Sequence, residues 1–219
     1  MNIFDILGPV MVGPSSSHTA GAVRIGYVAR KLLGCKPVKV RIGMHGSFAA
    51  TGTGHGTDRA LIAGLLGMKP DDMRIPESFR QAEEDGLEFV FEDVRIPGAH
   101  PNTAVLHIEG EDGRMLEVQA SSQGGGRIMI DRIGQTDVHC TGEKPSLIIR
   151  NHDSPGIVAE VTRILSAENI NIATLQLYRD RRGGCAVMIL ETDQQIGSEI
   201  SERMKKVRGI KEIRYISPV

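Results

Sequence analysis

Two stretches of the chain concentrate side chains that can bind anions and move protons. The first, GPSSSHTAG at residues 13–21, holds three consecutive serines, His18 and Thr19. Consecutive Ser and Thr side chains compete with helix geometry, so this stretch predicts a loop that caps the apolar helix after it. Hydroxyls and free N–H groups at a helix start suit a carboxylate or phosphate. An ordinary capped helix with a surface histidine fits the same residues.

The second stretch, HGSFAATGTGHGTDRALIAGLLG, occupies residues 45–67. Its pattern predicts a strand, then a glycine-rich loop whose amides can approach a ligand, then a helix. It lacks the Lys-Ser/Thr pair of a P-loop and has no convincing GxGxxG fingerprint. His45 and His55, taken alone, are more often structural than catalytic.

Composition narrows the function classes. The chain has 219 residues, 40% of them hydrophobic, which is enough for one large domain or two small ones. A net charge of −1, 4% aromatic residues and no tryptophan give no case for nucleic-acid or membrane partners. There is no apolar run of about 20 residues and no basic region followed by an apolar core at the start, so we expect a cytoplasmic protein.

The three cysteines, Cys35, Cys140 and Cys185, lie far apart and form no CxxC pair. They argue against a disulfide framework and against a self-contained zinc or iron–sulfur site. We therefore predict no metal ligands in this chain.

Periodicity divides the chain into two α+β domains. Residues 134–145 lose periodicity and carry glycine, threonine and proline, as expected of a boundary. We predict a first domain at residues 1–140, a linker at 141–147 and a second domain at 148–219. The first domain should place a helix at 19–33 before a strand at 38–44, a second helix after Thr57, and strands at 88–94, 102–108, 114–120 and 128–133.

The second domain has the element order βαββαβ, which predicts a ferredoxin-like sandwich with both helices on one face of the sheet. We expect Asp153 or Ser154 to cap its first helix and Asn169 to suit the end of that helix. The stretches NHDSPGI and NINIATLQL resemble an ACT domain, an amino-acid-sensing module. The resemblance implies an effector site at Asp153, Gly156 and Ile157, or a module that serves only for pairing.

The blocks GPSSSHTAGAVRIG and GSFAATGTGHGTDRALIAGLLG, followed by the ACT-like end, resemble the beta subunit of iron–sulfur-dependent L-serine dehydratase (L-serine ammonia-lyase). The resemblance extends essentially from Met1 to Val219. It implies an α/β first domain that is similar to the allosteric substrate-binding domain of some phosphoglycerate dehydrogenases. It also implies the conversion of L-serine to pyruvate and ammonia through an aminoacrylate, a reaction of amino-acid metabolism and gluconeogenesis.

In that family a separate alpha chain carries the [4Fe-4S] cluster, although some members fuse the two chains. The resemblance therefore implies a heterodimer in which this chain completes the active site, with self-association through the ACT domain. His18 and His55 are the candidates for proton transfer, because abstracting an α-proton needs a base that titrates near neutrality. Which of the two faces the substrate stays open. The candidates for binding the substrate are Ser15, Ser16, Ser17, Thr19, Ser47 and Thr57.

Two further hypotheses remain. In the first, the chain is a purely regulatory or assembly subunit that binds an amino-acid or anion effector without contributing catalytic groups. In the second, it is a free-standing amino-acid sensor. A catalytic role predicts that His18→Ala abolishes turnover while the complex still forms. A regulatory role predicts altered activation or assembly instead.

Overall fold

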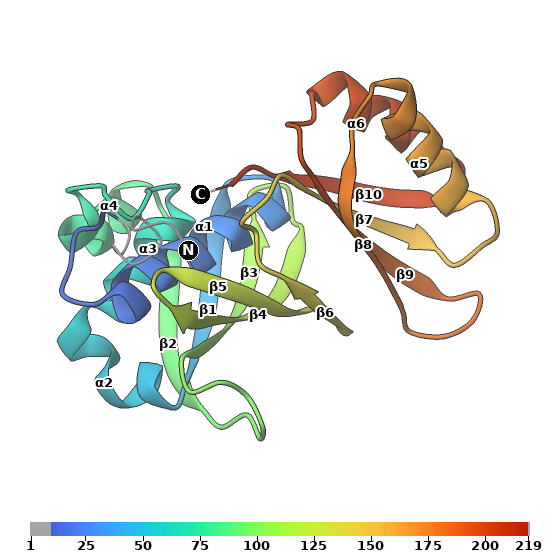
Figure 1. Ribbon diagram of the computed structural model, residues 1–219. Helices are drawn as coiled ribbons and strands as arrows, with labels where there is room; N and C mark the ends of the chain where they lie inside the picture. The colour runs from blue at the N-terminus through green and yellow to red at the C-terminus, as the bar shows by residue number, and fades with distance from the viewer. Residues whose placement is uncertain (1–9, 219) are drawn as a thin grey trace. The chain divides into compact units, whose positions relative to one another are not determined.

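The computed structural model describes residues 10–218, so the first nine residues of the predicted first domain and the last residue of the second lie outside the described residues. The chain forms two compact units, Met1–Gly134 and Gln135–Val219. Figure 1 shows a sheet with its own helices in each. The predicted linker, residues 141–147, begins directly after the last strand of the first sheet, but its last residues, Ser146 and Leu147, already belong to the first strand of the second sheet. Among the described residues, no helix is long and apolar enough to cross a membrane.

The first sheet has six strands in the order β2-β1-β3-β4-β5-β6. Strand β1 pairs in parallel with β2 and antiparallel with β3, so the sheet is mixed. Its strands are β1 (Pro37–His45), β2 (Glu88–Val94), β3 (Thr103–Gly110), β4 (Met115–Gly124), β5 (Arg127–Ile133) and β6 (Thr136–Cys140).

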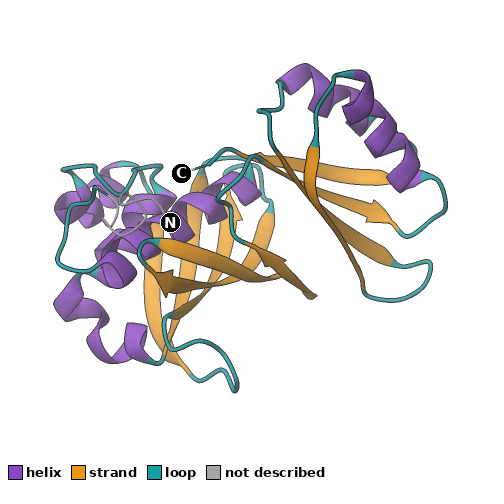
Figure 2. Ribbon diagram, in the orientation of Figure 1, coloured by secondary structure: helices purple, strands orange, loops and turns teal. Residues whose placement is uncertain are grey.

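The predicted helix at 19–33 is present but starts with a π-helical turn, η2 (Ser16–Ala20), which continues as α1 (Gly21–Leu33). Gly34 ends the helix in the left-handed conformation (φ 77°), where a residue without a Cβ carries no penalty. The other helical segments of this unit are α2 (Ser47–His55), α3 (Thr57–Leu65), η3 (Ile75–Glu77) and α4 (Ser78–Glu84). Figure 2 shows the helices of this unit gathered together rather than spread around the sheet.

Helices α1 and α3 cross with their backbones in contact. A Cβ on Gly64 would lie 2.0 Å from the carbonyl oxygen of Val23, and one on Gly26 would lie 2.2 Å from that of Leu61. The adjoining side chains Ile25, Leu61 and Ile62 are fully buried. This close crossing fixes α1, which carries the first motif, against α3, which follows the second.

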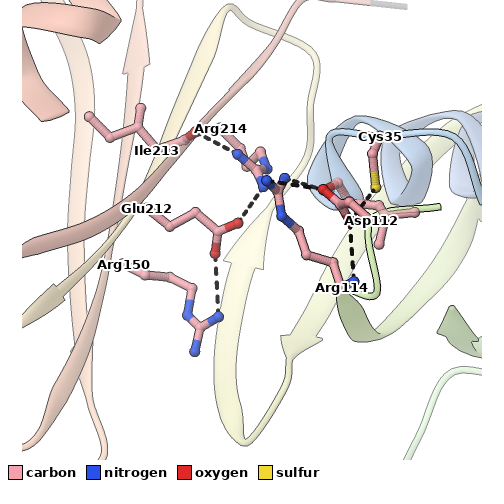
Figure 3. Close-up of polar contacts among 8 residues, drawn as sticks. Cys35, Asp112, Arg114, Arg150, Glu212, Ile213 and Arg214 are labelled. Carbon is pink, nitrogen blue, oxygen red and sulfur yellow. Dashed lines mark hydrogen bonds and ion pairs between the residues drawn. The ribbon is translucent and has the colours of Figure 1, made fainter. Parts of the chain in front are cut away.

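The predicted hairpin turn at Asp112-Gly113 joins β3 to β4. The Asp112 carboxylate accepts hydrogen bonds from the Cys35 thiol (3.2 Å) and the backbone N–H of Arg114 (3.1 Å), as Figure 3 shows. These hydrogen bonds, the thiol's first, hold the pKa of Asp112 below its usual value. Cys35 thus helps to hold the β3–β4 turn through its hydrogen bond to Asp112.

The second unit confirms the predicted βαββαβ order. Its sheet has the strand order β10-β7-β9-β8, and α5 and α6 pack on one face over a core that includes Leu147, Leu190 and Met204. Its elements are β7 (Ser146–His152), α5 (Ile157–Ala167), β8 (Ile172–Arg179), β9 (Cys185–Thr192), α6 (Ser198–Lys205) and β10 (Ile210–Ile216).

The start of α5 differs from the prediction. Its N-cap is Gly156 (φ 93°), with no side-chain cap, so neither Asp153 nor Ser154 caps the helix. The Asp153 carboxylate is instead occupied by Arg179 (3.1 Å) and the N–H of Gly183 (3.0 Å). Asn169 follows the helix at φ 53°, the left-handed conformation that asparagine tolerates at helix ends.

Candidate active site

Ser15 positions the first motif. Its side chain caps η2 by accepting the backbone N–H of His18 (3.1 Å), as the run of hydroxyls predicts. The turn that follows leaves Ser15, Ser16, Ser17 and His18 partly exposed and buries Thr19. The histidine is therefore held by its own backbone in the first turn of the helix.

The second motif differs from the predicted glycine-rich loop, because Ser47–His55 forms the helix α2. Glycine is a poor helix former, but tertiary contacts hold this segment. The N–H of Ser47 donates to the carbonyl of Pro101 (2.8 Å), and Phe48 is fully buried. Gly46 must be glycine, because its φ is 57° and a Cβ would lie 2.6 Å from the Pro101 oxygen.

Four hydroxyls surround the ring of His18. Nδ1 lies 3.1 Å from the Ser17 hydroxyl and 3.5 Å from that of Ser15. Nε2 lies 3.0 Å from Ser47 Oγ and 3.2 Å from Thr51 Oγ1. The edge of the ring also meets Phe48, with the ring centroids 5.4 Å apart. The two motifs, far apart in sequence, therefore form one site around this imidazole.

The hydroxyl of Thr51 fixes the protonation of His18. Its O–H donates a hydrogen bond to the carbonyl of Ser47 (2.9 Å), so its oxygen can only accept a hydrogen bond from His18. Nε2 of a neutral His18 must then carry the proton, and Nδ1 accepts a hydrogen bond from the Ser17 hydroxyl. If Ser47 Oγ also accepts from Nε2, its own O–H remains available to a ligand.

His55 lies beside His18, with ring centroids 5.2 Å apart, and its side chain is exposed. Its Nδ1 lies 3.3 Å from the carbonyl oxygen of Thr51, which can only accept, so Nδ1 is protonated. The lone pair of a neutral His55 is therefore on Nε2. This geometry makes His55 the more accessible base and His18 the histidine embedded in a hydroxyl network.

Burial, followed by the charge of nearby His55, lowers the pKa of His18 below its usual value, although a hydrogen bond with the Ser47 backbone opposes the shift. We expect His18 to titrate below about 6.5 and to titrate at higher pH in His55→Gln, which lacks the neighbouring charge. Histidine ring signals followed by NMR against pH measure both midpoints. An unchanged His18 midpoint in His55→Gln would contradict this coupling.

The same shift has a consequence for stability. Folding favours neutral His18, so its contribution to stability is complete above the unfolded pKa of about 6.5 and is lost as the pH falls through the folded pKa. His18 thus adds to stability at neutral pH but not in acid.

The predicted substrate-binding residues divide into two groups. Ser15, Ser17 and Ser47 contact His18 directly, and Ser16 lies partly exposed in the same turn. Thr19 is buried and donates to the carbonyl of His55 (3.3 Å), which ties the two motifs together. Thr57 is fully buried, so its hydroxyl does not reach the surface around His18.

Thr51 belongs to the site but is not among the residues predicted from the sequence. Residues 47, 51 and 55 are spaced by four, which places Ser47, Thr51 and His55 on one face of a helix. This spacing of four residues is visible in the sequence, but it groups the three side chains only if the segment is helical.

A pocket of about 280 Å³ adjoins His55, and we call it the His55 pocket. It is lined by Val12, Gly13, Pro14, Thr19, Gly54, His55, Gly56, Arg59, Ile75 and Pro76. Both motifs contribute to it, so it belongs to the same site.

The chain's own side chains do not fit an iron–sulfur cluster. Cys35, Cys140 and Cys185 are free, and Cys35 and Cys185 contact Asp112 and Lys211 respectively. Within residues 10–218, no group of three or more His, Cys, Asp or Glu side chains could hold a metal ion.

The second unit has a pocket of about 720 Å³ at the start of α5. Gly156 and Ile157, two of the predicted effector-binding residues, line it together with His152, Glu160 and Arg208. Asp153 does not line it, because its carboxylate is bonded to Arg179 and Gly183.

Comparisons with known proteins agree with this architecture. The family model described as "Serine dehydratase beta chain" matches residues 2–86, and the model of the ACT domain matches residues 146–209. The second unit is thus an ACT domain.

Several relatives cover most of the chain. The "Probable L-serine dehydratase, beta chain" of Bacillus subtilis is 39% identical over 99% of this chain and 98% of its own length. The "L-serine dehydratase, beta chain" of Peptoniphilus asaccharolyticus is 33% identical over 97% of this chain and 96% of its own. A D-3-phosphoglycerate dehydrogenase of Archaeoglobus fulgidus is 26% identical over 89% of this chain and 37% of its own length.

Proposed function

Since this chain belongs to the family of L-serine dehydratase beta chains, we propose that it is the half of a two-chain L-serine dehydratase that supplies proton transfer. The reaction would remove water from L-serine and release pyruvate and ammonia. The observation that carries the proposal is the pair of histidine rings, 5.2 Å apart, of which His18 is surrounded by hydroxyls from both motifs and His55 is exposed.

The tautomers suggest a division of roles. His55, with its lone pair on exposed Nε2, would accept the α-proton of the substrate. His18 would orient the hydroxyls of Ser47 and Thr51 and hold a proton on Nε2. Ser15, Ser16, Ser17 and Ser47 would bind the polar groups of the substrate. The buried Thr57 would support these loops from behind, and Thr19 would tie the two motifs together at the wall of the His55 pocket.

We propose that a [4Fe-4S] cluster belongs to the partner alpha chain, since the cysteines of this chain do not fit one. When bound there, the cluster would supply an open iron as a Lewis acid. The residues of this chain would position the substrate and move its proton. Such a complex would work in the cytoplasm.

For the ACT domain we propose effector binding in the pocket beside Gly156 and Ile157, with self-association through the same domain. Arg208 and Glu160 provide opposite charges at this pocket, as a zwitterionic amino acid requires. Asp153 would act indirectly, by fixing the turn before α5 to the β8–β9 turn. Calorimetric titration of the full chain with free amino acids tests this binding.

A regulatory or assembly role is the second candidate. It is favoured by the similarity to a D-3-phosphoglycerate dehydrogenase over 89% of this chain, since that relative carries a different enzyme name. In that case the two motifs would bind an effector anion or the partner.

We expect pyruvate release from L-serine only when this chain and its cluster-bearing partner are mixed under anaerobic conditions. Each chain alone should be inactive, because each holds half of the site. Turnover by the partner alone at the rate of the mixture would contradict the shared site and favour the regulatory role. No turnover in the mixture would refute the lyase assignment.

A further inference from the structure

The His55 pocket is lined by a charged side chain, Arg59, to which the proposed function assigns no role. Arg59 is the one residue with a permanent charge among the ten that line it. Among the described residues, no carboxylate side chain lines the pocket, and the neighbouring Asp58 uses an oxygen to accept the backbone N–H of Arg59 (2.7 Å). The charge balance of the pocket wall therefore favours an anion.

The guanidinium of Arg59 is held in place. One N–H donates to the carbonyl of Pro76 (2.6 Å), and the group lies 4.7 Å above the ring centroid of Phe79. Phe79 in turn packs on Phe89, with the ring centroids 4.9 Å apart. A guanidinium on such a support loses little freedom when it binds a ligand.

Most of the donors of Arg59 are uncommitted. An arginine side chain has five N–H donors, and the contact with Pro76 uses one of them. Within the part of the chain that the structure describes, no carboxylate forms an ion pair with Arg59. By contrast, Arg80 on the nearby helix α4 is paired with Glu84 at 2.7 Å.

The pocket suits a small ligand. Its volume of about 280 Å³ lies just below the range for sites that bind drug-sized molecules, about 300–1,000 Å³. A Cβ on Gly54 or Gly56 would meet nothing within 4 Å, so the wall beside His55 is open. The ligand would lie between the base and the cation.

We propose that Arg59 binds the carboxylate of the amino-acid substrate in the His55 pocket, an inference that rests on the proposed function. Guanidinium and carboxylate form paired, charge-assisted hydrogen bonds, which fix the orientation of the ligand as well as its position. The α-carbon beside the bound carboxylate then lies on the side of the pocket that His55 lines.

Binding to the full-length chain tests this directly. We expect L-serine to shift the ring signals of His55 in NMR spectra, and Arg59→Met to weaken this binding about 10- to 100-fold, the worth of a charged hydrogen bond. Arg59→Lys, which keeps the charge, should recover part of the affinity. The matched control Arg80→Met removes an equal charge outside the pocket and should bind like the wild type.

L-serinamide separates carboxylate binding from a structural role of Arg59. It lacks the negative charge, so Arg59→Met should not change its affinity. Equal loss for both ligands, an unchanged affinity for L-serine, or no shift of His55 in the wild type would overturn the inference.

Kinetics of the complex with the partner distinguish this inference from the proposed function. Arg59→Met should raise KM for L-serine about 10- to 100-fold with kcat changed only a few-fold. An inactive wild-type complex refutes the proposed function, while the binding titration still decides the role of Arg59. An active complex with an unchanged KM in Arg59→Met refutes only the role of Arg59.

Discussion

Replacing His18 by alanine is expected to lower kcat of the assembled enzyme about 10²-fold, because the hydroxyls that position the substrate would lose the imidazole that orients them. The substitution removes the acceptor for Ser17 and the donor to Ser47 and Thr51 together. All four hydroxyls around the ring then lose their common partner. Pyruvate release, measured anaerobically in the mixture with the partner, gives kcat and KM.

We expect the His18→Ala variant still to form the complex with the partner, and size-exclusion chromatography checks this. His107→Ala is a matched control, because His107 is a half-buried histidine of the same unit whose partner is Glu117 on the neighbouring strand. It should keep wild-type kcat. Undiminished turnover in His18→Ala would remove this residue from the mechanism and favour the regulatory role.

His55→Ala should cause a loss at least as large, about 10²- to 10⁴-fold, the usual contribution of a positioned general base. It removes the basic imidazole nitrogen that His55 presents at the surface of the site, whereas the hydroxyl network around His18 remains. If His55→Ala retained activity while His18→Ala lost it, the assignment of the two roles would be reversed.

The largest loss of stability is expected for Gly64→Ala. The new Cβ would lie 2.0 Å from the carbonyl oxygen of Val23 and 2.6 Å from the backbone nitrogen of Tyr27, so helices α1 and α3 must separate. Backbone atoms cannot rotate away as a side chain can. Overpacking typically costs about 1–3 kcal/mol, and a backbone clash lies at the upper end, well above the gain of about 1 kcal/mol that alanine brings to a helix.

A net loss of about 2 kcal/mol or more would lower the melting temperature of the first unit by roughly 4–8 °C. Circular dichroism against temperature measures this change. Gly54→Ala is the matched control, because Gly54 also lies in a helix and its Cβ would meet nothing within 4 Å. Equal melting temperatures for Gly64→Ala and Gly54→Ala would show that the helices can separate at little cost.

Separation of α1 from α3 would also move the site. Helix α1 continues the turn that carries His18, and α3 begins two residues after His55. Gly64→Ala should therefore lower activity even at temperatures where the protein is folded. This coupling explains why the glycines at the helix crossing matter to a site that they do not touch.

The sequence by itself determined the elements with strong local signals. The ACT unit was predictable in full order, because its strands either contain an unbroken apolar run, as in β7 and β9, or alternate, as in β8, and its apolar residues repeat at helical spacing in α5. The start of the first helix was predictable for a local reason as well, since Ser15 caps a turn three residues away.

Only the tertiary structure decided that residues 47–55 form a helix. Four positions of that segment are glycine or threonine, which are weak helix formers, so local propensity favoured a loop. The carbonyl of Pro101, on a segment about fifty residues away, and the burial of Phe48 reverse that preference. The helix in turn places Thr51 between the two histidines.

The roles of individual side chains were likewise decided by contacts between distant segments. Sequence spacing could not tell His18 from His55, because tautomers depend on which acceptor lies opposite each nitrogen. It also could not show that Asp153 bonds to Arg179 and Gly183, or that Arg59 lines the His55 pocket. Local sequence sets backbone preference, whereas the direction and protonation of a polar side chain depend on partners that only the fold brings near.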